Sequence, residues 1–584
     1  MTEFHSPMPA PHIPDDLTIP QFLFDYSHPI QMARGPNEAT WVIDAATGER
    51  YGKEALKERT WGLANGLSLK FGLGPTDTVG IISGNHLDFA IAVWAAHRLG
   101  ATVFTLNPTF NAEEILPSIR DMQPALLFVH PMALAAATTA ATTVGLSLER
   151  IVLLATSTPV SPHPLATELI ALGHDNKSTH SFVEYKLAPG EGKTKTALCF
   201  PSSGTTGVPK MAALPHASVI ANVLQNAAWD MGLGEVPIPV KERRFRVGDV
   251  SLAALPFFHI FGLLINLQYH LFCGMTVVIM PKFDFREFLA AIKTYRVNQL
   301  SLVPPIMVLF SKHPAVVPAD LTSIRVVFAG GAPVNQHFVK AMAEMLPQAV
   351  VEQSYGMTEV SGIVGMPSLD RKISTGSGGI LLPGNSARVM KTIIEEDGTT
   401  RTEMAKAGES GELYLRGPST ATHYVNNAQI SQETFVDGWV RTGDEVYIDE
   451  KCEIYVLDRI KDFIKVRAFQ VAPAELEARL AASPDVADVC VVPVPDEFSG
   501  QLPKAYVVLS AAALERVAAS ANPDEEREKI KAALAKDIAE NKAKYKALAG
   551  GVEFIEAIPR NAAGKLLRRV LRAKAAETAA AAAA

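Results

Sequence analysis

Cysteine is scarce in this chain: four of its 584 residues are cysteines, and they lie tens of residues apart. The sequence contains no Cys-x-x-Cys pair, so a disulfide framework and a zinc-ribbon site are excluded. The first residues also lack the basic stretch and apolar run of a signal peptide. The last three residues are alanines rather than Ser-Lys-Leu. These absences make the cytoplasm the expected localisation.

The excess of one charge over the other is small, with 54 Lys and Arg against 61 Asp and Glu and a formal net charge of −7. Such a chain has no sequence-wide attraction for phosphate backbones, which argues against nucleic acid as the partner and favours small molecules. A long uninterrupted hydrophobic run is also absent. The most apolar stretch, residues 251–280, is broken by Pro256, His259, Asn266 and His270, which a lipid-spanning helix of roughly 20 residues rarely accepts. We expect it to form buried core and expect no transmembrane segment.

An alternation of short β-branched runs with helical segments fills residues 78–353. Near-continuous apolar strands of this kind are typical of parallel sheets covered by helices on both faces, in which ligands bind at the carboxyl ends of the strands. After residue 374, glycine-punctuated alternating segments predict antiparallel strands. The sequence therefore predicts an α/β fold with a large N-terminal domain of helix-covered sheets plus a β-rich subdomain, residues 1–458. The polar segment 235–249 is interpreted as a surface loop.

A change of pattern near residue 459 predicts a second domain. A cation-rich stretch is followed by a helix from Pro473, two apolar strands and a helix that begins with acidic residues. A chain of this length is also too long for a single hydrophobic core. We expect a small, mobile α+β C-terminal domain over residues 459–575 and a disordered alanine-rich tail over residues 576–584.

Five polar clusters lie at predicted strand ends or turns. In the first, Ser202 to Lys210, two glycines allow backbone N–H groups to turn inward as an anion nest, hydroxyl groups add donors, and the lysine adds charge. A polyphosphate is the natural ligand of such a loop. The spacing of its glycines differs from that of a Walker loop, and a mobile surface loop is the alternative interpretation.

The other four clusters are residues 256–259, 353–359, 441–444 and 559–565. Each is weak evidence when taken singly. Taken alone, His259 is typical of a hydrogen-bonded core residue and Tyr355 of a packed aromatic. Asp444 is typical of a turn residue, and Lys565 of a solvated surface charge. Their order along the chain carries more information than any one of them.

The order of the five clusters, with the Ser/Thr/Gly loop first and the Gly-Lys turn near the C-terminus, resembles the adenylate-forming superfamily of acyl-CoA synthetases, non-ribosomal adenylation domains and firefly luciferase. The chain is most similar to the 4-coumarate:CoA ligase-like branch, because residues 458–477 look like the linker and following loop of that branch. The resemblance extends from about Asp25 to Arg572.

The resemblance implies a two-step ligase reaction. An aryl, phenylpropanoid or medium-chain fatty acid attacks the α-phosphorus of MgATP and releases pyrophosphate, and the thiol of coenzyme A then displaces AMP from the acyl group. The chemistry requires two anions to meet in one site, which must therefore be cationic and rich in donors. Two alternatives stay open. The acyl group could pass to a carrier protein in trans or to an oxidation, or the chain could be an inactive nucleotide-binding interaction protein.

Most of the clusters are assigned to the nucleotide by the same resemblance. Glu359 would coordinate Mg²⁺, Thr358 would bind the α-phosphate and Asp444 the ribose hydroxyls. Adenine would lie between Tyr355 and the segment 331–333, and the Ser/Thr/Gly loop would hold the β- and γ-phosphates. The implied ATP-binding residues are Ser202, Ser203, Gly204, Thr205, Thr206, Gly207, Lys210, Gly331, Ala332, Pro333, Gln353, Ser354, Tyr355, Gly356, Thr358, Asp444 and Arg459.

The remaining implied residues act on the acyl group and the thiol. Lys565 would neutralise charge in the first step, and Lys465 would act in thioester formation after the small domain rotates about a hinge at Lys461. Two positions depart from the family pattern: Met211 follows the phosphate loop where glycine is usual, and Ala468 occupies another glycine position near the expected pantetheine tunnel. The implied catalytic residues are Lys565, Lys465, Gln470 and His259, and the implied acyl pocket comprises Phe257, Phe258, His259, Phe261, Gly330 and Gly331.

Overall fold

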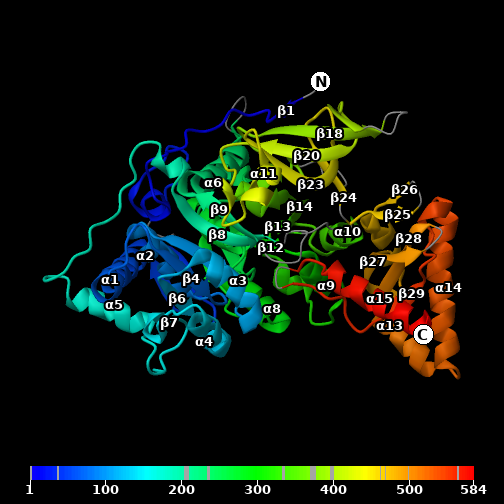
Figure 1. The fold of residues 1–584 in the computed structure, drawn as a ribbon, viewed down its shortest axis with the longest axis horizontal. Coiled ribbons are helices and arrows are strands. Elements are labelled where there is room, and N and C mark those ends of the chain that lie inside the picture. Colours follow the sequence, from blue (N-terminus) through cyan, green and yellow to red (C-terminus); the bar gives the residue numbers. More distant parts are fainter. Residues whose placement is uncertain are drawn as a thin grey trace.

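Two seven-stranded sheets form the core of the large domain (Figure 1). The computed structural model describes residues 3–35, 39–202, 210–232, 237–331, 336–368, 376–394, 400–460, 462–466, 469–496, 499–561 and 564–583. The first sheet has the order β21-β9-β8-β5-β4-β6-β7. The five consecutive strands from β8 to β7 in this order are parallel. Its strands are β4 (Thr78–Ile82), β5 (Thr102–Leu106), β6 (Leu126–Val129), β7 (Ile151–Leu153), β8 (Thr196–Ser202), β9 (Lys210–Pro215) and β21 (His423–Tyr424).

The second sheet has the order β14-β13-β12-β10-β11-β2-β3 and is parallel except for β3. Its strands are β2 (Thr40–Asp44), β3 (Arg50–Gly52), β10 (Val250–Ala253), β11 (Thr276–Ile279), β12 (Gln299–Leu302), β13 (Val326–Ala329) and β14 (Val350–Gln353). The β-branched runs of the sequence coincide with these strands, which confirms the predicted α/β alternation.

Helices cover both sheets, and one of them, α6, is wholly interior, since all 16 of its residues are buried. The apolar stretch 251–280 is core as predicted, because the helical segment η7 (Phe261–Tyr269) within it is also fully buried. No helix in the described ranges is long and apolar enough to cross a membrane. The main helices of this domain are α1 (Lys53–Phe71), α2 (Leu87–Arg98), α3 (Ala112–Met122), α4 (Leu134–Thr143), α5 (Ala166–Asp175), α6 (His216–Met231), α8 (Phe285–Tyr295), α9 (Pro304–Lys312) and α10 (Gln336–Met345).

The predicted β-rich subdomain is an antiparallel sheet of order β1-β18-β20-β23-β22, with β19 on β18 and β24 on β23. A separate three-stranded sheet comprises β15 (Tyr355–Met357), β16 (Gly362–Met366) and β17 (Ile380–Leu381), which precede β18 in the chain. The strands of the larger sheet are β1 (Phe4–His5), β18 (Ser386–Ile394), β19 (Thr400–Met404), β20 (Gly411–Arg416), β22 (Phe435–Val436), β23 (Trp439–Ile448) and β24 (Ile454–Arg459), and α11 (Ala428–Thr434) precedes β22.

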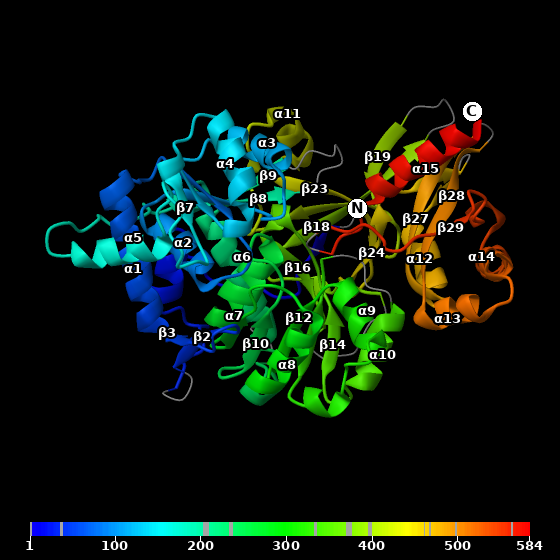
Figure 2. The same cartoon turned by 90° about the horizontal axis from the view of Figure 1, so that it is seen from below.

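The C-terminal residues form a small α+β unit with a hydrophobic core of its own, built from Ile464 to Leu548. Figure 2 shows this unit beside the large domain, with α14 on its outer side. Its elements are β25 (Ile464–Val466), β26 (Phe469–Val471), α12 (Pro473–Ala481), β27 (Val486–Asp496), β28 (Gly500–Leu509), α13 (Ala511–Ala519), α14 (Pro523–Asn541), β29 (Val552–Phe554) and α15 (Arg568–Ala583).

Helix α15 extends to Ala583, and the disorder expected for residues 576–584 stays a prediction. One sequence prediction is wrong. The segment 235–249 is not wholly a surface loop, since Arg244 and Phe245 are 2 % and 0 % exposed. Arg244 donates to both carboxylate oxygens of Glu352 at 2.6 and 3.0 Å, and this pairing offsets the cost of burying its charge.

A buried carboxyl group joins the two domains. Asp458 lies in β24 of the large domain, is 5 % exposed, and accepts a hydrogen bond at 3.1 Å from the backbone N–H of Ala474 at the start of α12. Burial raises the pKa of Asp458 to about 6, although the nearby Arg568 favours the charged form.

The raised pKa of Asp458 predicts a pH-dependent contribution to stability. A carboxyl group whose pKa rises on folding stabilises the folded protein fully below its unfolded pKa, near 4, and loses that contribution as the pH rises through 6. Asp458→Asn cannot ionise, so its unfolding free energy is expected to gain about 2–3 kcal/mol relative to the wild type between pH 4 and pH 7. Urea unfolding at the two pH values measures the difference. An equal pH response of both proteins would contradict the prediction.

Candidate active site

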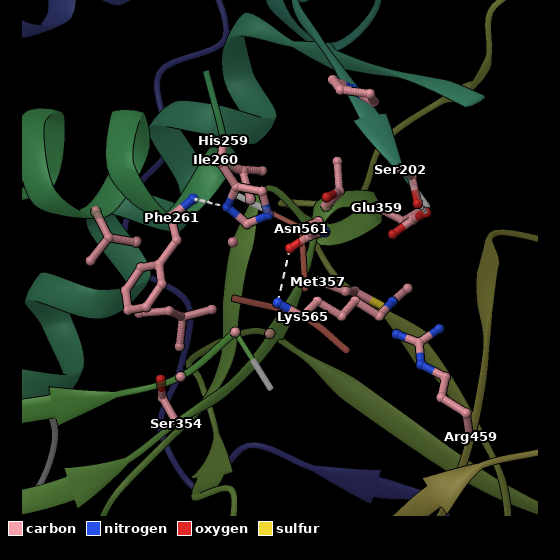
Figure 3. A pocket seen from close by; sticks show the side chains of 18 residues that line it. Ser202, His259, Ile260, Phe261, Ser354, Met357, Glu359, Arg459, Asn561 and Lys565 are labelled. Carbon is pink, nitrogen blue, oxygen red and sulfur yellow. Dashed lines mark hydrogen bonds between the residues drawn. The ribbon is translucent and has the colours of Figure 1, made fainter. Parts of the chain in front are cut away.

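A cavity of about 150 Å³ lies between the two domains (Figure 3). The large domain contributes Ser202 at the end of β8 and the residues that follow β13 and β14, which are carboxyl ends of sheet strands, as expected for α/β proteins. The small domain contributes Asn561 and Lys565. The lining residues are Pro201, Ser202, His259, Ile260, Phe261, Ile265, Gly330, Gly331, Ser354, Gly356, Met357, Thr358, Glu359, Gly362, Ile363, Arg459, Asn561 and Lys565.

A buried carboxylate, Glu359, lies next to Ser202 in this cavity. It is 4 % exposed, and its Oε1 atom accepts hydrogen bonds from Ser202 Oγ at 2.5 Å and from the Tyr424 hydroxyl at 2.6 Å. Burial raises the pKa of Tyr424, and the adjacent carboxylate raises it further, so the phenol stays protonated and donates. Sequence reasoning missed Tyr424, because no motif distinguishes it from a packed aromatic.

Asp444, Arg459 and Tyr355 form a second polar group. Asp444 and Arg459 pair in the register of β23 and β24, and Arg459 Nε lies 2.6 Å from Asp444 Oδ1. The Tyr355 hydroxyl donates to the other carboxylate oxygen at 2.6 Å. Burial and the neighbouring Asp444 raise the pKa of Tyr355, which keeps this donor protonated. Asp444 is 2 % exposed, and each of its carboxylate oxygens therefore has a partner, Arg459 or Tyr355. Arg459 also lines the cavity.

A tight turn holds Lys565 in the cavity. The backbone N–H of Asn561 donates to the Lys565 carbonyl at 2.9 Å, and the backbone N–H of Lys565 donates to the side-chain Oδ1 of Asn561 at 2.9 Å. Gly564 has a φ of +79°, and a Cβ at this position would lie 3.1 Å from Val303 Cγ2 of the large domain. The turn therefore needs glycine both for its backbone conformation and for the close approach. Burial lowers the pKa of Lys565, and repulsion from Arg459 lowers it further.

His259 faces the same cavity in a neutral state. Its Nδ1 atom accepts a hydrogen bond at 3.3 Å from the backbone N–H of Phe261. Burial lowers the pKa of His259 to about 4, and the positive charge of Lys565 adds to the effect. The imidazole is therefore uncharged near neutral pH and is not a cationic partner for a carboxylate.

The opposite wall of the cavity is apolar. Phe261, Gly330 and Gly331, predicted for the acyl pocket, line the cavity together with Ile260, Ile265 and Ile363, which sequence reasoning missed. Met357 also lines the cavity, beside Lys565 (Figure 3). In the sequence, an apolar residue that lines a pocket cannot be distinguished from an apolar residue of the core.

Phe257 and Phe258, predicted for the acyl pocket, are not among the lining residues. Phe257 is fully buried and packs on Phe89 with ring centroids 5.8 Å apart. Hydrogen bonds from the Phe257 N–H to Asn85 and from Thr105 to the Phe258 carbonyl hold this turn against the first sheet. These contacts hold Phe257 and Phe258 outside the cavity lining, and their role in an acyl pocket stays a prediction.

The other predicted residues divide into three groups. Ser354, Gly356 and Thr358 line the cavity. Lys210 lies outside the lining, with its Nζ 5.6 Å from the ring centroid of Tyr424, and the Gln353 Oε1 atom is buried without a hydrogen-bond partner in the described part of the chain. The predicted residues that lie outside the described residues are Ser203, Gly204, Thr205, Thr206, Gly207, Ala332, Pro333, Lys461 and Ala468.

Lys465, predicted to act in thioester formation, is not among the residues that line the cavity. Lys465 is exposed on β25 and pairs in register with Gln470 on β26. Met211 is 1 % exposed and packs into a core cluster on the first sheet. Its side chain is therefore accommodated where glycine was the usual residue.

Comparison with known proteins decides the family. Residues 30–425 match the AMP-binding enzyme family, and residues 475–565 match the AMP-binding enzyme C-terminal domain. The chain belongs to the AMP-binding enzyme family. The resemblance inferred from the five clusters is thereby confirmed, and the two matched regions lie within the large domain and the small unit of this family member.

Among its relatives, 4-coumarate–CoA ligase 2 of Oryza sativa subsp. japonica is 33 % identical over 98 % of this chain and 95 % of the relative. Probable 4-coumarate–CoA ligase 1 of Dictyostelium discoideum is 30 % identical over 98 % of this chain and 97 % of the relative.

Solved structures share the fold of this AMP-binding enzyme. ATP-bound MatB from Rhodopseudomonas palustris has a TM-score of 0.78 at 24 % identity and covers 95 % of this chain and 98 % of that chain. A benzoate CoA ligase from Burkholderia xenovorans LB400 has a TM-score of 0.76 at 21 % identity, and the match covers 95 % of this chain and 100 % of that chain. The predicted fold class is confirmed.

Proposed function

We propose that this protein is an ATP-dependent, AMP-forming ligase that joins a carboxylic acid to coenzyme A. The observation that carries the proposal is the convergence of Glu359, Arg459 and Lys565 on one cavity whose opposite wall is apolar. Adenylation brings a carboxylate and a triphosphate together, and fixed cations and donors in a partly desolvated site offset their repulsion. Relatives named as CoA ligases support the same reaction.

In the first step, a carboxylate oxygen attacks the α-phosphorus of ATP, the bond between that phosphorus and the bridging oxygen breaks, and pyrophosphate leaves. Lys565 would stabilise the negative charge that grows at the α-phosphate, where Thr358 would also donate a hydrogen bond. The ribose would bind at Asp444 and Arg459, with adenine beside Tyr355. No residue has to remove a proton, because a carboxylic acid is already ionised near neutral pH, which agrees with the low pKa of His259, about 4.

In the second step, the thiol sulfur of coenzyme A attacks the acyl carbon, and AMP leaves with the oxygen that came from the carboxylate. The thiol proton is released. We assign residues 1–458 and 459–575 to the two domains and propose that the small one rotates about Lys461 after adenylation. That rotation would remove Lys565 from the cavity and bring Lys465 and Gln470 towards it. The exposure of Lys465 on β25 supports this assignment.

The donor set fits ATP bound as its Mg²⁺ complex. Mg²⁺ prefers oxygen ligands and is usually held by one or two carboxylates together with substrate phosphates. Within the described ranges, no group of three His, Cys, Asp or Glu side chains is arranged to hold a metal ion. Glu359 would therefore share the ion with the phosphates. Bound there, the ion would neutralise phosphate charge, while Glu359 and its hydrogen-bond donors fix its place.

The acyl substrate is proposed to be a compact apolar or aromatic acid. Beyond Gly330, two residues back along β13, Phe328 packs on Phe245 with ring centroids 6.3 Å apart, and Phe245 packs on Tyr269 at 5.0 Å. Two residues along a strand span about 7 Å. The packed aromatic rings therefore lie about 7 Å beyond Gly330 and limit the length of an acyl group that the pocket can hold. This favours aryl and phenylpropanoid acids over medium-chain fatty acids.

Enlarging Gly330 is expected to obstruct the acyl site. A Cβ at this position would lie 3.3 Å from Ser354 Oγ and 3.4 Å from Phe261 Cε1. Gly330→Val should lower kcat/KM for an aromatic acid about 10- to 100-fold, the range for one or two misplaced methylenes, with an unchanged KM for ATP. Steady-state kinetics with Gly74→Val as the control, at a glycine with open space around it, measure the difference. An unchanged kcat/KM for the acid would place the acyl group elsewhere.

Product analysis tests the proposed function. The protein is incubated with ATP, Mg²⁺, coenzyme A and a panel of benzoic, cinnamic and medium-chain acids, and products are identified by mass. AMP, pyrophosphate and an acyl-CoA thioester are expected. Acid-dependent pyrophosphate exchange without a thioester would point to transfer to a carrier protein or to an oxidation. Failure of every acid to support exchange would point to an inactive nucleotide-binding protein.

A further inference from the structure

The carboxylate of Glu359 has an asymmetric environment. Both hydrogen bonds found for its side chain in the described residues end on Oε1, one from Ser202 at 2.5 Å and one from Tyr424 at 2.6 Å. They are hydroxyl donors to an ionised acceptor, a class of hydrogen bond about twice as strong as neutral ones. Two donors on one oxygen fix the orientation of the carboxylate and leave the lone pairs of Oε2 for another ligand.

Tyr424 is held in place by contacts that do not involve Glu359. It belongs to β21, which pairs with β9, and its backbone N–H donates to Ser431 Oγ at 2.9 Å. Its ring packs on Phe435 with centroids 5.4 Å apart and is 7 % exposed in total. The backbone three residues earlier also contacts the glutamate, because Ala421 N donates to Glu359 O at 2.8 Å. The hydroxyl is therefore preorganised rather than recruited by the carboxylate.

We propose that Tyr424 is a positioning residue for the divalent cation of the nucleotide complex, acting through Glu359. The proposal rests on the metal-binding role given to Glu359 above. By occupying Oε1 together with Ser202, the phenol directs Oε2 towards the cavity and keeps a buried carboxylate hydrogen-bonded. Removal of an outer-shell partner of a metal ligand commonly weakens metal affinity about 10- to 100-fold.

Tyr424→Phe is the direct test, because it deletes the hydroxyl and keeps the ring packing. Mn²⁺ is used as the probe, and its binding to the protein with ATP and without acid is followed by electron paramagnetic resonance, so no turnover is needed. We expect the Mn²⁺ dissociation constant to rise about 10- to 100-fold, while ATP affinity in the presence of EDTA stays within about twofold. Tyr506→Phe is the matched control, since its buried hydroxyl has no hydrogen-bond partner in the described part of the chain.

Two further variants separate the possible failures. Ser202→Ala removes the second donor without touching Tyr424 and should also weaken Mn²⁺ binding, which supports the proposal if Tyr424→Phe proves unstable. Glu359→Gln should weaken Mn²⁺ binding most. The inference about Tyr424 is overturned if Glu359→Gln loses the ion and Tyr424→Phe binds it like the wild type. If Glu359→Gln also binds the ion normally, the metal-ligand role is wrong and the inference falls with it.

Discussion

Replacing Lys565 by alanine is expected to slow acid-dependent pyrophosphate release by about 10²- to 10³-fold, the loss typical when one preorganised donor is removed from a developing charge. The side chain lies in the cavity, where burial lowers its pKa, so its charge acts in a partly desolvated site. Stopped-flow measurement of pyrophosphate release with a saturating acid gives the rate. The small domain's fold should not change, because the turn is held by backbone and Asn561 contacts.

The second half-reaction provides the matched comparison. Lys565→Ala given a synthetic acyl-adenylate and coenzyme A should form thioester at nearly the wild-type rate. Lys465→Ala, altered at an exposed position of the same domain, should show the opposite pattern, with normal adenylation and slow thioester formation. Equal losses in both half-reactions for both variants would count against alternation of the small domain.

Asp444→Asn is expected to raise the KM for ATP about 10- to 100-fold, because hydrogen bonds to a charged group contribute about 1.5–3 kcal/mol each. The wild-type carboxylate engages Arg459 and Tyr355 on separate oxygens at 2.6 Å. An amide accepts with one oxygen only and leaves the guanidinium without its opposite charge. The KM for the acid should change little.

The control for this variant is Asp437→Asn, in an exposed turn with a φ of +50° that asparagine also tolerates. Its KM for ATP should match the wild type. A rise in the acid KM of Asp444→Asn as large as that for ATP would show that the Asp444 group supports the whole cavity rather than the nucleotide.

The parallel sheets were predictable because their strands are short apolar runs that repeat with helical segments between them. The site was partly predictable for a related reason. Gly330 and Ser354 follow the neighbouring parallel strands β13 and β14, whose carboxyl ends meet at one edge of the second sheet, and Ser202 ends β8 of the first sheet. Lys565 could be assigned to the same place only through the resemblance, because nothing local relates a turn in the small domain to the large one.

Residues whose role depends on tertiary contacts were not predictable. Tyr424 and Phe257 are both buried aromatics, yet one donates to Glu359 and the other is core, and their neighbours in sequence give no indication of which is which. Arg244 was hidden in a polar segment, because its burial depends on the carboxylate of Glu352 more than 100 residues away.

The path of the carboxylate oxygen tests the central claim most directly. The protein is given an aromatic acid labelled with ¹⁸O in its carboxyl group, together with ATP, Mg²⁺ and coenzyme A, and the phosphorus-containing products are analysed by mass. Attack at the α-phosphorus predicts one ¹⁸O atom in AMP and none in pyrophosphate. Label in inorganic phosphate, accompanied by ADP, would contradict adenylation and with it the assignment of the cavity between the two domains.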